Sequence, residues 1–259
     1  MIVSMVKMTV ATTGARAEDA LEGLRNLGLL HVSHVKTPES TALQALKAEG
    51  IRLGRALAIL PETKDPAAGN DSADAMEVAD EILSIRESMG DLFKTRGEML
   101  VEAERLAPLG DFSPDDISFL ESRGLSFRLF RCRAGDLART PVAVPHVVLR
   151  GKGNLRYVGC VSGEEFSLPF EELPAPAESL SGLMEKAGNA EAEIPRLKER
   201  LEELSRFRGL LAEARGEIAR RVEFQEIRDG MGTEGPLCYV QGYCPERDVG
   251  VVTAEASRR

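Results

Sequence analysis

The chain contains no tryptophan and few other aromatic residues, with 3 Tyr and 9 Phe among 259 residues. Large rings are the side chains that contribute most area to a broad hydrophobic core. Leu, Ala, Glu and Arg dominate the composition instead. This balance is typical of a chain that is rich in long helices. The length allows one large domain or two smaller ones.

No block of positive charge is present, because 33 Lys and Arg are outnumbered by 42 Asp and Glu, giving a net charge of −9. Binding to nucleic-acid phosphates requires clustered positive charge, so a nucleic-acid partner is not expected. The longest apolar stretches, such as residues 142–149, fall far short of the roughly 20 residues that a membrane-spanning helix needs. The N-terminus lacks the basic and apolar regions of a signal peptide, which indicates a cytoplasmic chain.

Cysteines are few and scattered. They are Cys132, Cys160, Cys238 and Cys244. We expect reduced thiols, as in other cytosolic proteins. Extended chain would separate Cys238 from Cys244 by about 20 Å, at ~3.3 Å per residue, so only a sharp turn at Gly242 would join them at a metal.

The pair His31 and His34 has a spacing that suits zinc on a helix. Here alternating valines around both residues predict a strand, and the odd spacing sends the two rings to opposite faces. Structural roles are expected for both histidines. The sequence therefore predicts no catalytic residue, no cofactor or cofactor-binding residue, and no metal ligand.

The first 37 residues predict a βαβ unit. Alternating apolar residues predict a half-buried strand over residues 3–12. The spacing of the leucines in residues 16–27 predicts an amphipathic helix, and Gly28 follows at the position where a left-handed turn ends a helix. A second strand is expected over residues 31–36, so the crossover helix would join two parallel strands.

Another helix is predicted over residues 40–60, with Gly50 as its weak point. Residues 61–72 contain two prolines, a glycine and an Asn-Asp pair, which indicates a loop. Ser72 is then in position to cap the helix that follows.

Two long segments carry apolar positions in steps of 3 and 4, the pattern of a coiled-coil stripe. The first stripe is Ala75, Val78, Ile82, Ile85, Met89, Leu92, Arg96, Met99, Ala103 and Leu106; the second is Ile194, Leu197, Leu201, Leu204, Arg208, Leu211, Arg215, Ile218, Val222 and Gln225. The matching helices, residues 73–106 and 195–228, are 34 residues long each, which favours pairing with one another as an antiparallel hairpin. The alternative is a compact helical bundle.

Two arginines stand at apolar positions of the second stripe. Arg208 and Arg215 either pair with carboxylates of the opposite helix and fix its register, or extend along the surface to water. The pattern leaves both alternatives open.

A distinct block lies between the two stripes, over residues 107–173. The run Ser113-Pro114-Asp115-Asp116 has the N-cap, proline and acid that begin a helix. Strands are expected at 126–132, 146–150 and 155–161, the last two joined by the hairpin turn Gly-Lys-Gly-Asn. That turn lacks the spacing of a phosphate loop and leads into a strand.

Three glycines, at 230, 232 and 235, precede a strand expected over residues 236–245, and a helix would begin at Glu246. With the N-terminal βαβ unit these elements form most of a β-α-β-β-α-β sheet. Its last strand is missing, so we expect a fragment of a longer protein, or a partner or rearrangement that covers the sheet edge.

The predicted fold class is α+β, with two small α/β lobes joined by a long antiparallel helical hairpin. The expected division has three parts. They are a discontinuous, ferredoxin-like proximal lobe of residues 1–37 and 235–259, a hairpin of residues 38–106 and 174–234, and a distal lobe of residues 107–173.

The opening MIVSMVKMTVATTGARAEDALEGLRNLGLLHVSHV, the order of the helices and the segment YVQGYCPERDV resemble the cytoplasmic N-terminal half of subunit I (subunit a) of V-type and A-type ATPases. The resemblance covers essentially the whole chain. Its clearest markers are LGLLHV after the first helix and Gly242-Tyr243-Cys244-Pro245, which is similar to the family's Gly-aromatic-aliphatic-Pro turn. Cys244 departs from the usual aliphatic residue.

The resemblance implies a non-catalytic stator subunit of a proton- or sodium-translocating ATPase, at the cytoplasmic face of the membrane. Its implied partners are the E- and G-type peripheral-stalk subunits, at both lobes, and the central-stalk cap subunit. The rotor ring would be reached only through a membrane half, which also carries the family's channel arginine and is absent from this sequence. The sequence downstream of Arg259 is then expected to encode several apolar runs of ~20 residues.

Two other functions agree with the same residues. One is a coiled-coil tether unrelated to ion transport, for which the 3-and-4 spacing is sufficient. The other is a small-molecule-sensing α/β module. A thermal shift of several degrees with a common metabolite would favour this last function.

Overall fold

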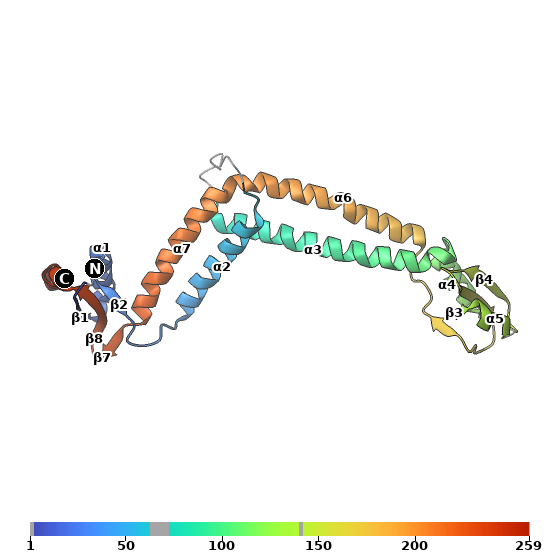
Figure 1. Cartoon of the computed structure of the whole chain (residues 1–259), viewed down its shortest axis with the longest axis horizontal. Helices are drawn as coiled ribbons and strands as arrows, with labels where there is room; N and C mark the ends of the chain where they lie inside the picture. Colours follow the sequence, from blue (N-terminus) through green and yellow to red (C-terminus); the bar gives the residue numbers. More distant parts are fainter. Residues whose placement is uncertain (1–2, 63–72, 140–141, 259) are drawn as a thin grey trace. The chain divides into compact units, whose positions relative to one another are not determined.

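The computed structural model describes residues 3–62, 73–139 and 142–258 (Figure 1). It confirms the α+β class, with two antiparallel sheets and long helices. The chain divides into two compact units: unit 1 comprises Met1–Ser84 and Leu201–Arg259, and unit 2 comprises Ile85–Arg200. The division into two lobes and a hairpin stays a prediction. The cap expected at Ser72 lies outside the described residues.

Sheet A of unit 1 combines strands from both ends of the chain. Strand β8 (Leu237–Pro245) lies between β1 (Met5–Thr13) and β2 (His31–Ser33) and is antiparallel to both, and the short β7 (Gly232–Glu234) also pairs with β8. Strands β1 and β2 therefore run in the same direction with β8 between them. The predicted βαβ unit is present in its split form.

Two helices cover one face of sheet A. They are α1 (Ala17–Leu27), preceded by the short η1 (Gly14–Arg16), and α8 (Val249–Arg258), preceded by η4 (Glu246–Asp248). The core between helices and sheet contains Leu21, Leu24, Met231, Val240, Cys244 and Val252. Helix α1 ends as predicted, because Gly28 takes the left-handed conformation (φ 64°) and its N–H donates to the carbonyls of Leu24 and Arg25.

Helix α2 (Thr41–Ile59) packs in unit 1 against α7 (Arg208–Asp229). The Ser40 hydroxyl caps α2 by accepting the N–H of Leu43. Gly50, which the sequence marks as a weak point, faces α7: a Cβ there would stand 3.4 Å from Ile218 Cγ2. The glycine therefore allows close approach of the two helices.

This packing contradicts part of the predicted pairing. The sequence predicts that the helix over residues 195–228 pairs with the helix over residues 73–106. Its C-terminal half, α7, packs along α2 instead. A stripe at 3-and-4 spacing shows that one face of a helix is buried, and it does not say against which helix.

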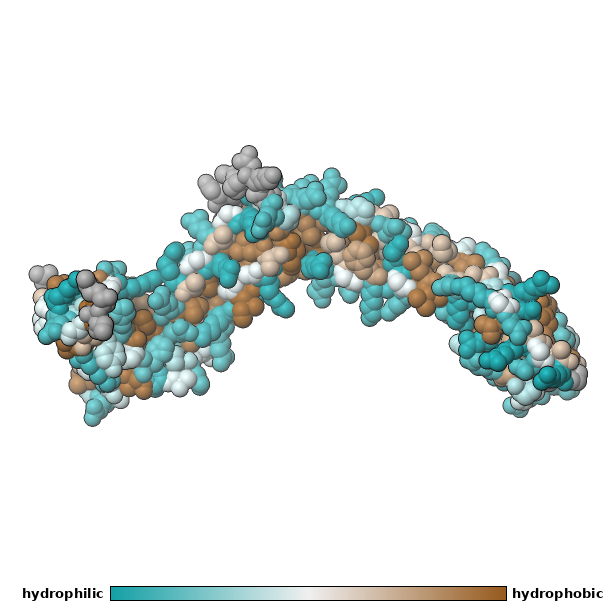
Figure 2. Space-filling model, in the orientation of Figure 1, coloured by the Kyte–Doolittle hydropathy of each residue, from teal (hydrophilic) through white to brown (hydrophobic). Residues whose placement is uncertain are grey.

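Within unit 2, α3 (Ala75–Leu106) runs antiparallel to α6 (Leu180–Leu204). Arg96 bonds Glu191, and further along α3 the side chains of Ala103 and Leu106 pack against Leu183. The stripe on α3 is confirmed, because all ten predicted positions are buried or half-buried. Figure 2 shows hydrophobic residues concentrated along the line between the paired helices, with hydrophilic residues outside.

The second helix is longer than expected, because α6, the short η3 (Ser205–Phe207) and α7 follow one another without a break from Leu180 to Asp229. Nine of the ten predicted positions of its stripe are buried or half-buried, and the exception is Arg215.

Sheet B of unit 2 has the strand order β4-β5-β3-β6, all pairs antiparallel. Its strands are β3 (Ser126–Arg133), β4 (His146–Arg150), β5 (Leu155–Ser162) and β6 (Glu171–Leu173). The Gly-Lys-Gly-Asn hairpin between β4 and β5 is confirmed, with Gly153 at φ 61°. The short η2 (Ala107–Leu109) leads into α4 (Pro114–Ser122), which is capped by Ser113 as predicted.

Three short elements have no counterpart in the prediction: β6, β7 and α5 (Ala134–Arg139). Each is six residues or shorter, so none spans enough residues to establish a period of 2 or 3.6. The four residues compared with a Gly-aromatic-aliphatic-Pro turn also differ from expectation, because Gly242 to Pro245 form the end of β8.

Candidate functional site

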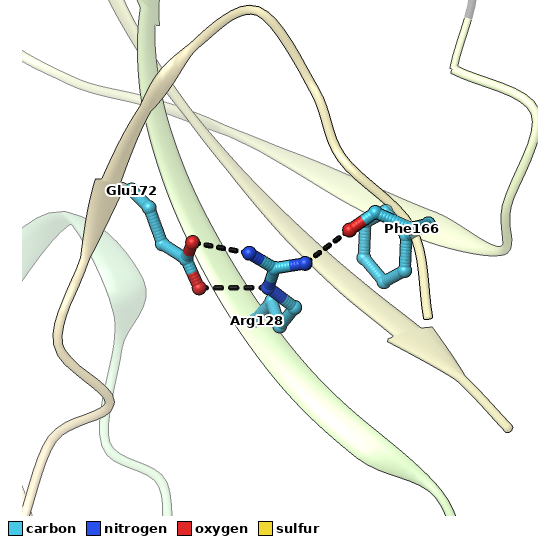
Figure 3. Close-up of polar contacts among 3 residues, drawn as sticks. All are labelled: Arg128, Phe166 and Glu172. Carbon is cyan, nitrogen blue, oxygen red and sulfur yellow. Dashed lines mark hydrogen bonds and ion pairs between the residues drawn. The ribbon is translucent and has the colours of Figure 1, made fainter. Parts of the chain in front are cut away.

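Arg128 on β3 holds together one edge of sheet B (Figure 3). Its Nε donates to Glu172 Oε1 at 2.7 Å, its Nη2 donates to Glu172 Oε2, and its Nη1 donates to the carbonyl of Phe166. The guanidinium also lies 5.4 Å from the ring centre of Phe130 and 5.1 Å from that of Phe166. One side chain thus joins β3 to β6 and to the loop before β6.

Arg131 makes a second pair of this kind: it faces Glu171 in register and binds it through Nε at 2.9 Å and Nη2 at 2.7 Å. We call these two pairs the Arg–Glu ladder. A bidentate arginine–carboxylate pair fixes orientation as well as charge. The hydrogen bond from Arg128 lowers the pKa of Glu172, so this carboxylate stays charged to a lower pH than an ordinary glutamate.

The cysteines of unit 2 lie on the same face of sheet B as Arg128, because residues 128, 130 and 132 of β3 point to one side. Cys132 and Cys160 are buried with Phe130 and Val158, and both are free thiols. Burial raises the pKa of both thiols, which keeps them protonated at neutral pH. The expected reduced thiols are confirmed for all four cysteines, which are free. The two in unit 2 are inert core residues.

The opposite face of sheet B carries an apolar groove, with η2 and α4 along its side. Its volume is about 290 Å³, and its lining includes Leu109, Ile117, Leu120, Leu129, Val147 and Val161. Leu129 on its floor is 1% exposed, whereas Val147 on the edge strand β4 is 62% exposed. The groove is therefore open at the β4 edge of the sheet.

In unit 1 the ends of α2 and α7 are joined by polar side chains. Arg208 Nη1 donates to the carbonyls of Leu57 and Leu60, both at 3.1 Å, and so caps the C-terminus of α2. At the other end, Asp229 accepts hydrogen bonds from the Ser40 hydroxyl, at 2.5 Å, and from Gln225.

These contacts settle the alternatives for the two arginines. Among the described residues Arg208 has no carboxylate partner, and its side chain binds backbone carbonyls instead of extending to water. Arg215 is exposed on the surface. The 3-and-4 spacing does not predict the capping role of Arg208. The carbonyls that it binds belong to the end of another helix, and the spacing within one helix does not show which helix end lies beside it.

The strand expected over residues 31–36 is shorter than predicted, because β2 ends at Ser33 and contains His31 but not His34. His31 lies in β2 opposite Tyr243, and the ring of His34 lies against Gly230 at the end of α7. Cys238 and Cys244 both belong to the continuous strand β8, with Gly242 inside the strand. In the part of the chain that the structure describes, no group of three or more His, Cys, Asp and Glu is placed to hold a metal ion.

Sequence reasoning missed both the Arg–Glu ladder and the apolar groove. The alternation in residues 126–132 identified the strand and hence its two faces. The sequence did not predict which residues lie across from that strand, because β6 and the loop before it have no periodic pattern of apolar residues. Among the described residues, no helix combines the length and the apolar character needed to cross a membrane.

Comparison with known proteins gives a consistent result. No protein-family model matches the chain. V-type ATP synthase subunit I 1 of Treponema pallidum (strain Nichols) is 27% identical over 278 residues, covering 95% of this chain and 43% of that protein. The chain therefore spans less than half the length of this curated relative.

Among solved structures, a crystal structure of the cytoplasmic N-terminal domain of subunit I, homolog of subunit a, of V-ATPase is similar with a TM-score of 0.47. It is 18% identical, with 97% of each chain covered. The curated similarity runs through nearly the whole chain and agrees with the markers at both ends of the sequence. The chain is thus similar, over nearly its whole length, to V-type ATP synthase subunit I.

Proposed function

We propose that this chain is the cytoplasmic stator portion of a rotary V/A-type ATPase, which connects peripheral stalks to the ion-translocating membrane half and performs no chemistry itself. The single observation that carries the proposal is the similarity of 95% of the chain to V-type ATP synthase subunit I. The peripheral-stalk partners would be the E- and G-type subunits, bound by both lobes, with the central-stalk cap subunit as a further contact.

The connection between the two units supports a mechanical role. Helix α3 spans residues 75–106 and passes without interruption through the division at residue 84. On the return path α6 spans residues 180–204 and passes through the division at residue 200. Both crossings of the division therefore lie within a helix, whose backbone is hydrogen-bonded. A stator has to transmit torque, so this construction agrees with the proposal.

The proposal is tested by co-purification. The chain is expressed with a tag, together with the E- and G-type stalk subunits of the same organism. We expect a stable complex in size-exclusion chromatography. A chain that elutes alone, with both stalk subunits folded and present in excess, would contradict the proposal.

A second measurement separates the stator from a simple coiled-coil tether. The complete subunit is extracted from its native membrane in detergent, and its associated proteins are identified by mass spectrometry. Rotor-ring and stalk subunits are expected in the same particle. Recovery of the protein without any ATPase subunit would favour the tether.

A further inference from the structure

The apolar groove of unit 2 is a hollow built into sheet B. Its floor is formed by a row of side chains across three strands, in which Val147 on β4, Gly159 on β5 and Leu129 on β3 stand opposite one another. Gly159 contributes no side chain to this row. A Cβ at this position would stand 3.2 Å from the ring of Phe127, so the absence of a side chain at Gly159 leaves the space above the sheet free.

The lining of the groove has one charge. Of its 13 lining residues, Asp116 alone is ionisable, and the others are apolar or uncharged. Asp116 stands in the first turn of α4 and is exposed. Among the described residues its carboxylate has no ion-pair partner. An occupant therefore meets a wide apolar surface and one carboxylate at the rim.

The volume limits the size of that occupant. About 290 Å³ lies at the lower end of the range for ligand sites, which is roughly 300–1,000 Å³. Burial of an apolar group is favourable in proportion to its area, and a cation at the rim would satisfy Asp116. An anionic head group would be repelled instead.

We propose that this groove binds a small amphiphilic cation, whose hydrocarbon body lies on the floor formed by Leu129 and Val147 and whose ammonium group pairs with Asp116. The groove and its charge are features of unit 2 alone, and the binding of a small cation to it does not depend on the stator function. Its test therefore stands whether or not the stator proposal holds.

The test is a titration of the whole chain with octylammonium, followed through the methyl NMR signals of Val147, Leu149 and Val161. We expect saturable shifts of these methyls. Hexylammonium should bind roughly fifteenfold more weakly, because each buried methylene is worth about a fourfold change in affinity. Nonanoate, which has the same eight-carbon alkyl chain and the opposite charge, should bind about fivefold more weakly than octylammonium.

Two matched variants separate the charge from the helix end. Asp116→Asn should abolish the preference for octylammonium over nonanoate and leave the chain-length dependence intact. Asp115→Asn removes the neighbouring carboxylate from the same first turn of α4 but does not line the groove, so it should bind both probes as the wild type does.

Several results would overturn the proposal. They are equal affinity for hexylammonium and octylammonium, equal affinity for nonanoate and octylammonium in the wild type, and shifts confined to other parts of the chain. Shifts of the same methyls on raising the protein concentration alone would also overturn it, because a second copy of the chain would then be the occupant.

Discussion

Sheet A joins strands from opposite ends of the chain, whereas sheet B is formed by strands that all lie between Ser126 and Leu173. In sheet A the central strand β8 is more than 200 residues away in sequence from both of its long-range neighbours, β1 and β2. The entropy of closing that loop must be overcome before any of these pairs contributes stability. Sheet B can form from local pairs, so we expect it to fold first.

The two sheets also differ in how their strands are held. In sheet A, Gly242 on β8 allows β2 to approach: a Cβ there would stand 2.6 Å from the carbonyl oxygen of His31. In sheet B the short strand β6 is held by the long side chains of Arg128 and Arg131. Where two backbones lie in close contact, as at Gly242, a larger side chain cannot be accommodated. Exposed ion pairs, by contrast, contribute only modestly to the free energy of unfolding, so mutations at these contacts should destabilise sheet A more than sheet B.

The largest effect is expected from removing β7, β8 and α8, which are residues 232–259. Strands β1 and β2 have no other strand partner among the described residues, so sheet A should be lost. Amide hydrogen exchange is the measurement: Met8 and Val10 should lose protection, and Val158 of sheet B should keep it. Loss of protection at Val158 as well would show that the two sheets depend on one another.

Gly242→Ala should destabilise unit 1 by about 3 kcal/mol, because the new Cβ meets backbone that has little freedom to move. Denaturant unfolding measures the change. Gly216→Ala in α7 is the control: a Cβ there meets nothing within 4 Å, so the variant should be up to about 1 kcal/mol more stable. If both variants unfold at the same denaturant concentration, close approach at Gly242 is not what holds β2.

Arg208→Met should cost about 2 kcal/mol, because it removes a charged donor from two carbonyls at the end of α2. Arg215→Met, one heptad later on the same helix, should change the free energy of unfolding by less than about 0.5 kcal/mol, since its side chain is exposed. Equal losses in the two variants would mean that packing of the arginine stems matters and the cap does not.

The smallest effect concerns the Arg–Glu ladder and pH. The pKa of Glu172 in the folded chain lies below its ordinary value of 4.5. Its contribution to stability is therefore present above that ordinary pKa and is lost as the pH falls through the folded pKa. Arg128→Met should thus destabilise unit 2 at pH 7, and the difference from wild type should shrink at pH 3 in urea unfolding. A difference that is the same at both pH values would assign the effect to stacking on the phenylalanines.

Local patterns predicted most of the elements. The strand over 126–132, the helix over 16–27 with its end at Gly28, and the capped helix after Ser113 all depend on neighbouring residues. The interaction that stabilises each of them lies within a few positions of sequence, so the sequence is sufficient to place it.

Partners were harder to predict. The stripe containing Ile218 was correctly identified as buried, but its assignment to residues 73–106 was wrong because α7 lies along α2. Gly50 is unfavourable within an isolated helix, and its role in letting α7 approach is visible only once the two helices are paired.

The sequence by itself determined the helices, most of the strands, the buried stripe of each long helix and the resemblance to subunit I. These follow from spacing along one chain segment. Only the tertiary structure decided that β8 separates β1 from β2, that Arg208 caps α2, and that a groove with a single carboxylate opens on sheet B. Each of these depends on two segments distant in sequence, and periodicity within one segment contains no information about its neighbour in space.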